Sequence, residues 1–235
     1  DKEDFDTSVW EENILSYYQV DGKQYSMPFN SSTPVLIYNK DAFEKAGLDP
    51  EKAPRTYDEL KQAAKTLTTD GQTGFTMLNY GWFFEQLVAA QGGLYVDNDN
   101  GRSGAPTKAV FDVEEGQNAF NLIKEMYDEK TFMNVGQNWD DMRAAFQSGK
   151  VAMYLDSSAG IRTVADNADF EVGASYLPVP NEAEREGVII GGASLWMGDG
   201  IADETKQGAW EFMKYAASKE AQAKWHVETG YFAIN

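Results

Sequence analysis

Residues 28–50 read PFNSSTPVLIYNKDAFEKAGLDP, and this stretch decides the fold. Its middle part, residues 35–38, is apolar and β-prone, which predicts a buried strand. Asn39 and Asp41 then begin a short helix, because their side chains accept hydrogen bonds from the free N–H groups of a first turn. Gly47 ends this helix, since glycine tolerates the left-handed conformation common at helix C-termini. The stretch therefore predicts a strand, a polar cap and a helix in succession.

A polar run, Asn30-Ser31-Ser32-Thr33, precedes the predicted strand. Hydroxyl groups at the end of a buried strand need hydrogen-bond partners. Either the local backbone or a bound ligand can supply those partners. We favour a ligand role for Ser32, because the run carries more hydroxyls than one turn requires.

The same order of strand, polar cap and helix recurs along the chain. Further strands are predicted at residues 73–78, 151–155, 170–179 and 188–197, and further helices at residues 56–67, 79–92, 112–126, 140–146, 203–217 and 218–228. Alternating strands and helices predict an α/β fold with a largely parallel sheet and helices on both faces. Ligands of such sheets bind at the carboxyl ends of the strands. Asp21-Gly22 lies between two short β-prone runs and predicts a hairpin turn.

Composition excludes several classes of function. The chain has 235 residues and a formal net charge of −18, so nucleic acid and anionic lipid would be repelled. It has no cysteine, which rules out disulfides and thiolate chemistry. It also has no apolar run of about 18 residues, the length that a membrane-spanning helix needs.

Catalysis has little support in the sequence. His226 is the single histidine, and no serine lies in a G-x-S-x-G motif, so a serine triad is not indicated. The phosphate-binding P-loop and the dinucleotide fingerprint are absent as well. Residues 96–106 superficially resemble a calcium loop, but the glycine is misplaced and no closing glutamate follows. We therefore predict neither catalytic residues nor a metal or cofactor, with a glycan- or lipid-processing hydrolase and an inert interaction module as alternatives.

Three segments carry a resemblance to a known family. They are residues 28–60, residues 189–196 (IIGGASLW) and residues 225–231 (WHVETGY). Through them the chain resembles family 1 of the extracellular solute-binding proteins of ABC transporters, in particular the branch that binds sn-glycerol 3-phosphate and its diesters. The resemblance covers essentially the whole chain.

The resemblance implies a fold and a division of the chain. The fold is α/β, periplasmic-binding-protein-like II, of the two-lobe type, here with one nearly whole lobe and part of the other. Residues 1–32 are expected in the first lobe and hinge, residues 33–188 in the second lobe, and residues 189–235 back in the first. The family's opening segment, with two ligand residues, is expected before Asp1, and its last helices, with a phosphate-binding arginine, after Asn235. The chain is thus expected to be a fragment that binds weakly by itself.

The resemblance also implies ligand-binding residues. They are Ser32, Trp82, Ser157, Gly192 and Tyr231. Each has a structural alternative, such as helix capping by Ser157, a β-bulge at Gly192 or packing by Tyr231. Asn79 stands where the family has a second tryptophan, and this change favours a larger or more polar head group.

The function implied by the resemblance is uptake. The protein would be the substrate-binding component of an ABC importer that captures sn-glycerol 3-phosphate or a glycerophosphodiester between two lobes. The alternative is a sugar or oligosaccharide, with Tyr80, Trp82 and Tyr95 as stacking platforms. The expected partners are this small-molecule ligand and the membrane permease subunits of the transporter, with no nucleic acid. The expected location is extracytoplasmic, in the periplasm or on the cell surface as a lipoprotein.

Overall fold

The computed structural model describes residues 5–181 and 183–235, which form two compact units. Unit 1 comprises the chain up to residue 33 and from residue 190 onward, and unit 2 comprises residues 34–189. The boundaries expected from the sequence, after residues 32 and 188, each lie one residue before those of the structure, after residues 33 and 189. Residues 1–4 of the first expected segment, and residue 182 in the polar loop of the second, lie outside the described residues.

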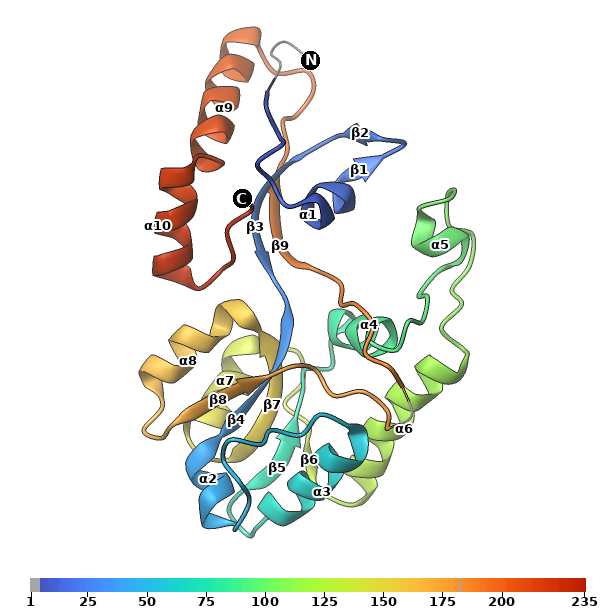
Figure 1. Ribbon diagram of the computed structural model, residues 1–235, viewed down its shortest axis with the longest axis vertical. Coiled ribbons are helices and arrows are strands. Elements are labelled where there is room, and N and C mark those ends of the chain that lie inside the picture. The colour runs from blue at the N-terminus through green and yellow to red at the C-terminus, as the bar shows by residue number, and fades with distance from the viewer. Residues whose placement is uncertain (1–4, 182) are drawn as a thin grey trace. The chain divides into compact units, whose positions relative to one another are not determined.

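Unit 2 is built on a five-stranded sheet with the strand order β6-β5-β7-β4-β8 (Figure 1). The strands are β4 (Pro34–Asn39), β5 (Thr73–Thr76), β6 (Phe132–Met133), β7 (Val151–Ser157) and β8 (Val172–Ser175). Strand β5 runs parallel to β6 and β7, whereas β4 runs antiparallel to both of its neighbours, β7 and β8. The prediction of a strand at residues 35–38 is confirmed.

Four of the five strands share one direction, as expected of a largely parallel sheet, but β4 runs the opposite way. The other four strands follow one another through helical connections, which set them in one direction. Strand β4 is where the chain enters the unit, and no such connection precedes it. As a result, Pro34 at the start of β4 pairs with Ser157 at the end of β7.

Helices complete unit 2. They are α2 (Lys40–Lys45), α3 (Tyr57–Leu67), α4 (Gly81–Ala89), α5 (Asp97–Gly101), α6 (Glu114–Asp128), α7 (Trp139–Gln147), the 3₁₀ turn η1 (Ser158–Gly160) and α8 (Ile161–Asn167). Helix α3 begins with the predicted capping box, in which Thr56 Oγ1 accepts a hydrogen bond from Glu59 N. Its face of Leu60, Ala63, Ala64 and Leu67 is buried in the core of the unit, as the spacing predicts.

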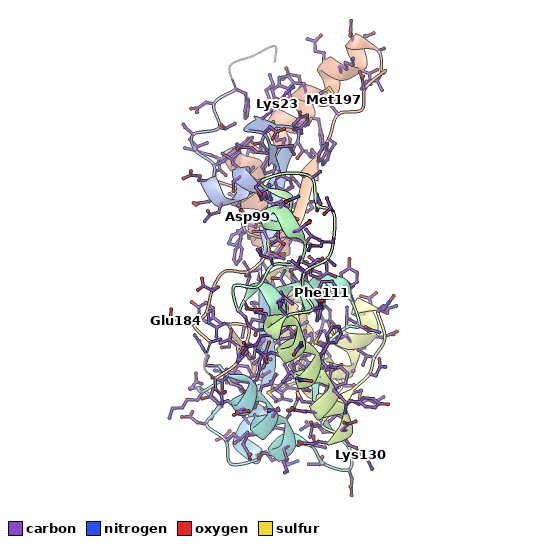
Figure 2. The ribbon with its side chains drawn as sticks, turned by 90° about the vertical axis from the view of Figure 1, so that its right-hand side faces the viewer. Lys23, Asp99, Phe111, Lys130, Glu184 and Met197 are labelled. Carbon is purple, nitrogen blue, oxygen red and sulfur yellow. The ribbon has the colours of Figure 1, made fainter. Side chains whose placement is uncertain are left out.

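The predicted surface turn at residues 96–106 contains a short left-handed stretch. Asn98, Asp99 and Asn100 have φ values of 55°, 55° and 51°, and Figure 2 labels Asp99. Asp97 orders the turn, because its carboxylate accepts hydrogen bonds from the backbone and hydroxyl of Thr107. In the described part of the chain, no group of three or more histidine, aspartate or glutamate side chains is arranged to hold a metal ion.

The described residues of unit 1 form two small sheets and three helices. Its elements are α1 (Glu12–Tyr17), β1 (Gln19–Val20), β2 (Lys23–Gln24), β3 (Met27–Ser32), β9 (Gly191–Leu195), α9 (Asp203–Ala216) and α10 (Lys219–Thr229). The β1–β2 hairpin turns at Asp21-Gly22 with φ values of 51° and 71°, as predicted. Strands β3 and β9 pair antiparallel. Among the described residues, no helix is both long enough and apolar enough to cross a bilayer.

The contact between α3 and β5 gives a test of the fold. A Cβ atom added at Gly74 would lie 2.1 Å from the carbonyl oxygen of Ala64, so backbone would have to move. We expect Gly74→Ala to lower the free energy of unfolding by about 1–3 kcal/mol, as overpacking does in other cores. Urea unfolding measures this, with Gly71→Ala as the matched control because its Cβ would meet no atom within 4 Å. Equal stability of the two variants would contradict the packing described here.

Candidate functional site

In unit 2, Trp82 and Ser157 follow the carboxyl ends of two neighbouring parallel strands. Ser157 is the last residue of β7, and Trp82 lies in the first turn of α4, the helix that follows β5. The two strands pair directly, with Thr76 opposite Tyr154. This edge of an α/β sheet is where ligands usually bind. The described structure thus brings both predicted residues to the same edge of one sheet.

Three aromatic side chains lie at this edge, and we call Tyr80, Trp82 and Trp139 the aromatic surface. The Trp139 ring lies 6.2 Å from the Tyr80 ring and 6.4 Å from the Trp82 ring, measured between centroids. Tyr80 is exposed, and both indoles are half-buried. Partly exposed aromatic faces suit stacking on the carbon skeleton of a ligand.

The carboxylate of Asp156 is buried next to Ser157, with its side chain 0% exposed. Arg143 donates to both carboxylate oxygens, from Nε to Oδ2 at 3.0 Å and from Nη2 to Oδ1 at 2.9 Å. Ser157 N donates to Oδ1 at 2.7 Å. Bidentate and charge-assisted bonds of this kind are the strong ones in proteins, so the position of Asp156 is fixed.

Tyr154 completes this network from the same face of β7, two residues before Asp156. Its hydroxyl donates to Oδ2 of Asp156 at 2.9 Å. Burial, followed by the negative charge of Asp156, raises the pKa of the Tyr154 phenol, and the bond to Asp156 raises the pKa of Arg143. The carboxylate of Asp156 thus accepts from Arg143, Tyr154 and Ser157 together.

Arg143 connects the network to the aromatic surface. Its guanidinium carbon lies 5.4 Å from the centroid of the Trp139 ring, and its side chain is 26% exposed. Trp139 and Arg143 lie one turn apart on α7, so they share a helix face. Contacts therefore run without a break from Trp82 through Trp139, Arg143 and Asp156 to Ser157.

Ser157 also has the structural role that the sequence left open. Its Oγ accepts a hydrogen bond from Ala159 N at 3.3 Å and so caps η1. Capping uses one lone pair, which leaves the hydroxyl proton free to be donated to a ligand. The capping bond therefore orients the Ser157 hydroxyl and leaves its proton available for a second hydrogen bond.

Unit 1 gathers the other three predicted residues around one strand. In the β3–β9 ladder, Ser31 pairs with Gly192 and Ser32 pairs with Gly191. On the other side of β3, Ser31 exchanges two backbone hydrogen bonds with Phe232, the residue after Tyr231. Ser32, Gly192 and Tyr231 are thus held close together by backbone pairing.

Ser32 is buried, with 2% of the residue exposed. The neighbouring Asn30 has a structural task, because its side-chain oxygen accepts from Ala193 N at 2.7 Å. A serine hydroxyl can both donate and accept a hydrogen bond, so the chemistry of Ser32 is compatible with a ligand contact.

Gly192 has a structural cause of its own. Its φ is 115°, and a Cβ atom there would lie 2.3 Å from the carbonyl oxygen of Asn30. The β3–β9 register shifts between Pro28 and Asn30, which marks a bulge opposite this part of β9. Glycine is therefore required here by the backbone alone, whether or not a ligand touches it.

His226 fixes the position of the Tyr231 backbone. Its Nδ1 lies 2.6 Å from the carbonyl oxygen of Tyr231, so this nitrogen carries the proton and donates it. Gly230 ends α10 with a φ of 81° and turns the chain at this point. The single histidine thus has a structural role, and Tyr231 itself is half-buried.

Asn79, which stands where the family has a second tryptophan, and Tyr95, considered as a stacking platform, lie in different settings. Asn79 is exposed and donates its backbone N–H to Gly136. Tyr95 stacks on Phe111 with centroids 4.7 Å apart and belongs to a separate cluster with Phe84. Figure 2 labels Phe111 in that part of unit 2.

Sequence reasoning missed Trp139, Arg143 and Asp156. Asp156 is the next-to-last residue of β7 and follows a buried apolar run, so its charge required a partner, and this was the available signal. Trp139 and Arg143 have the spacing of one helical turn, which by itself does not distinguish a ligand site from ordinary helix packing. Nothing in sequence alone pairs Arg143 with Asp156.

The comparisons with known proteins agree with this geometry. A family model described as bacterial extracellular solute-binding protein matches residues 1–235. The chain is 36% identical, over 98% of its length, to the sn-glycerol-3-phosphate-binding periplasmic protein UgpB of Yersinia pestis and to that of Escherichia coli (strain K12). Only 54% of each relative is covered, so the chain spans about half the length of the curated relatives it matches.

Solved structures show the same fold. The GacH receptor of Streptomyces glaucescens, solved unliganded and with acarbose, has a TM-score of 0.82 at 28% identity, over 98% of this chain and 58% of that one. UgpB from Mycobacterium tuberculosis, solved with glycerophosphocholine, has a TM-score of 0.81 at 24% identity with the same coverage. The predicted fold class, that of two-lobe periplasmic solute-binding proteins, is confirmed.

The matching family model and the relatives named above are all of solute-binding proteins. The chain belongs to the family of bacterial extracellular solute-binding proteins. The resemblance found in the sequence is thereby confirmed.

The geometry at Gly192 predicts the effect of a substitution. Gly192→Ala would need a positive φ and a shift of the Asn30 backbone, so we expect a loss of about 1–3 kcal/mol in the free energy of unfolding. Chemical denaturation without ligand measures it. Gly198→Ala is the matched control, because a Cβ atom there meets nothing within 4 Å. If the two variants are equally stable, Gly192 is required only for ligand contact.

Proposed function

We propose that this protein is the substrate-binding component of an ABC importer and that it captures sn-glycerol 3-phosphate or a glycerophosphodiester. The proposed ligand contacts are Ser32, Gly192 and Tyr231 of unit 1 with Trp82 and Ser157 of unit 2. Ligand binding shifts the population toward a bound conformation that the membrane permease subunits recognise. No nucleic acid and no cofactor take part.

The observation that carries the proposal is the placement of donors and rings at strand ends. Ser157 and the aromatic surface lie at one edge of the unit 2 sheet, and Ser32 of unit 1 offers a further hydroxyl. Hydroxyl groups can form hydrogen bonds with a small polyol and aromatic faces can stack on its carbon atoms, and neither interaction alters the ligand covalently. The printed names of the 36% identical relatives, sn-glycerol-3-phosphate-binding proteins, support the ligand class.

A sugar or oligosaccharide is the second candidate. It is favoured by the three rings of the aromatic surface, since sugars stack on aromatic side chains. The GacH receptor, with a TM-score of 0.82, was solved with acarbose. The ligand experiment below separates the two candidates.

An extracytoplasmic location is part of the proposal, in the periplasm or on the cell surface as a lipoprotein. The family description is extracellular, and the relatives are named as periplasmic proteins. The net charge of −18 argues against anionic membrane lipid as a binding partner.

The ligand is tested by titration calorimetry of the protein expressed from its complete reading frame. We expect heat of binding with sn-glycerol 3-phosphate or glycerophosphocholine and weaker binding of maltose. Tight binding of maltose alone would replace the first candidate with the second. Binding of none of the three would contradict the proposed function.

The aromatic surface is tested by Trp82→Ala. Removing a stacking ring is expected to weaken binding of the best ligand by about tenfold or more, because such contacts are worth about 1–2 kcal/mol with their buried area. Calorimetry measures the dissociation constant. Tyr127→Ala removes a ring that is 61% exposed on α6 and serves as the control with unchanged affinity. Equal affinities of the two variants would remove Trp82 from the site.

A further inference from the structure

The segment that leaves unit 2 is held on α4 by one buried side chain. Gln86 of α4 is 0% exposed, and its amide pairs with the backbone of Ile189, the last residue of the unit. Gln86 Nε2 donates to the carbonyl oxygen of Ile189 at 2.7 Å, and Ile189 N donates to Gln86 Oε1 at 2.9 Å. The side chain thus engages both polar groups of this backbone residue, as a neighbouring strand does.

A second bond holds the same segment further along α4. The backbone N–H of Glu186 donates to the carbonyl oxygen of Ala90, the residue that follows α4, at 3.1 Å. Residues 183–189 form no helix or strand, so these bonds take the place of regular pairing (Figure 1). The segment therefore follows α4 between two anchors, and Gln86 is the anchor nearer to the point where the chain leaves the unit.

The first crossing between the units is a short connection. Ser32 ends β3 and pairs with Gly191 of unit 1, and Pro34 begins β4 and pairs with Ser157 of unit 2. Thr33 is the one residue between these two ladders. Strand pairing thus holds the backbone on both sides of this crossing.

The second crossing is equally short, but only because of Gln86. Gly191 begins β9 and is held in unit 1 by the β3–β9 ladder. On the other side, Ile189 is held in unit 2 by Gln86, so Ile190 is the one residue between them. Without the Gln86 amide, the segment outside held backbone would reach back to the bond at the end of α4 and would contain residues 187–190.

We propose that Gln86 is a positioning residue for ligand binding: it limits the second crossing to Ile190, so that changes of orientation between the units are confined to one residue at each crossing. This inference rests on the proposed function. Movements between domains are absorbed by a few residues of this kind. A crossing with few rotatable bonds allows few orientations, so less conformational entropy is lost when a ligand selects one of them.

The anchor itself is tested by hydrogen exchange without ligand. Gln86→Leu keeps a side chain of similar volume and removes both bonds to Ile189. We expect the Ile189 amide to exchange faster by about tenfold, the effect of losing a hydrogen bond. Mass spectrometry of the peptide that contains Ile189 measures this on the protein from its complete reading frame. Gln91→Leu is the matched control with unchanged exchange, because its bonds to Leu87 and Glu115 lie within unit 2, away from the crossing.

The effect on ligand binding is measured by titration calorimetry with the same two variants. The probes are sn-glycerol 3-phosphate, glycerophosphocholine and maltose, and the comparison uses the probe that binds the wild-type protein best. We expect Gln86→Leu to raise the dissociation constant by about tenfold, because the released residues are ordered again on binding. Gln91→Leu is expected to change it by less than about twofold, since it releases no crossing residue.

Two glycine insertions separate the length of the crossing from the loss of a buried side chain, and they test the proposal even if Gln86→Leu fails to fold. A glycine inserted after Ile190 lengthens the crossing and leaves Gln86 unchanged, and we expect binding to weaken by about fivefold. A glycine inserted after Gly187 lies between the two anchors, where the chain is exposed and a Cβ atom meets nothing within 4 Å. This control is expected to keep the wild-type affinity.

Unchanged exchange of Ile189 in Gln86→Leu overturns the inference. It is also overturned if the folded Gln86→Leu variant and the insertion after Ile190 bind as tightly as their controls. Failure of the proposed function looks different, because the wild-type protein then binds none of the three probes. The exchange measurement needs no ligand, so in that case it still decides whether Gln86 holds the chain where it leaves unit 2.

Discussion

The structure of unit 2 depends on the direction of β4. This strand runs against the other four strands of its sheet, with β7 on one side and β8 on the other. Because of that direction, the start of β4 lies beside the end of β7, where Pro34 pairs with Ser157. The chain therefore enters unit 2 at the same edge of the sheet at which the parallel strands end. Chain connections of both kinds lie at this edge, and this explains why polar residues are found there.

A buried charge at the same edge has a cost that the fold must offset. Asp156 is 0% exposed, and an unpaired carboxylate there would be strongly destabilising. The bond to Arg143 removes that penalty, but a hydrophobic pair of similar volume is often equally stable or more so. Stability alone therefore gives no reason for the pair.

Much of the fold was predictable from sequence because the signals are local. The capping box at Thr56, the hairpin at Asp21-Gly22 and the strand at residues 35–38 each depend on neighbouring residues, and each is present. The direction of β4 was not predictable in this way, because alternation of strands and helices predicts parallel pairing only for strands joined by a crossover. Direction within a sheet is decided by distant partners, in this case β7 and β8.

Some residues of the candidate site could also be recognised from local sequence, and others could not. Ser157 and Trp82 were recognisable because each follows a strand, and the resemblance to a family pointed to them as well. Arg143 and Asp156 are thirteen residues apart on different elements, so no local pattern joins them. Gly192 shows the reverse, since its sequence context suggested a ligand contact while its φ of 115° already requires glycine.

Some residues of the candidate site are explained by the fold alone, and others are not. Gly192 and His226 have backbone tasks that account for them fully: one allows the bulge between β3 and β9, and the other holds the carbonyl of Tyr231. The rings of Trp82 and Trp139 pack against the core of unit 2 and remain partly exposed. Packing accounts for the covered part of each ring, whereas the open part lies at the edge where sheets of this class bind ligands. An open aromatic face at that edge suits stacking on the carbon skeleton of a ligand.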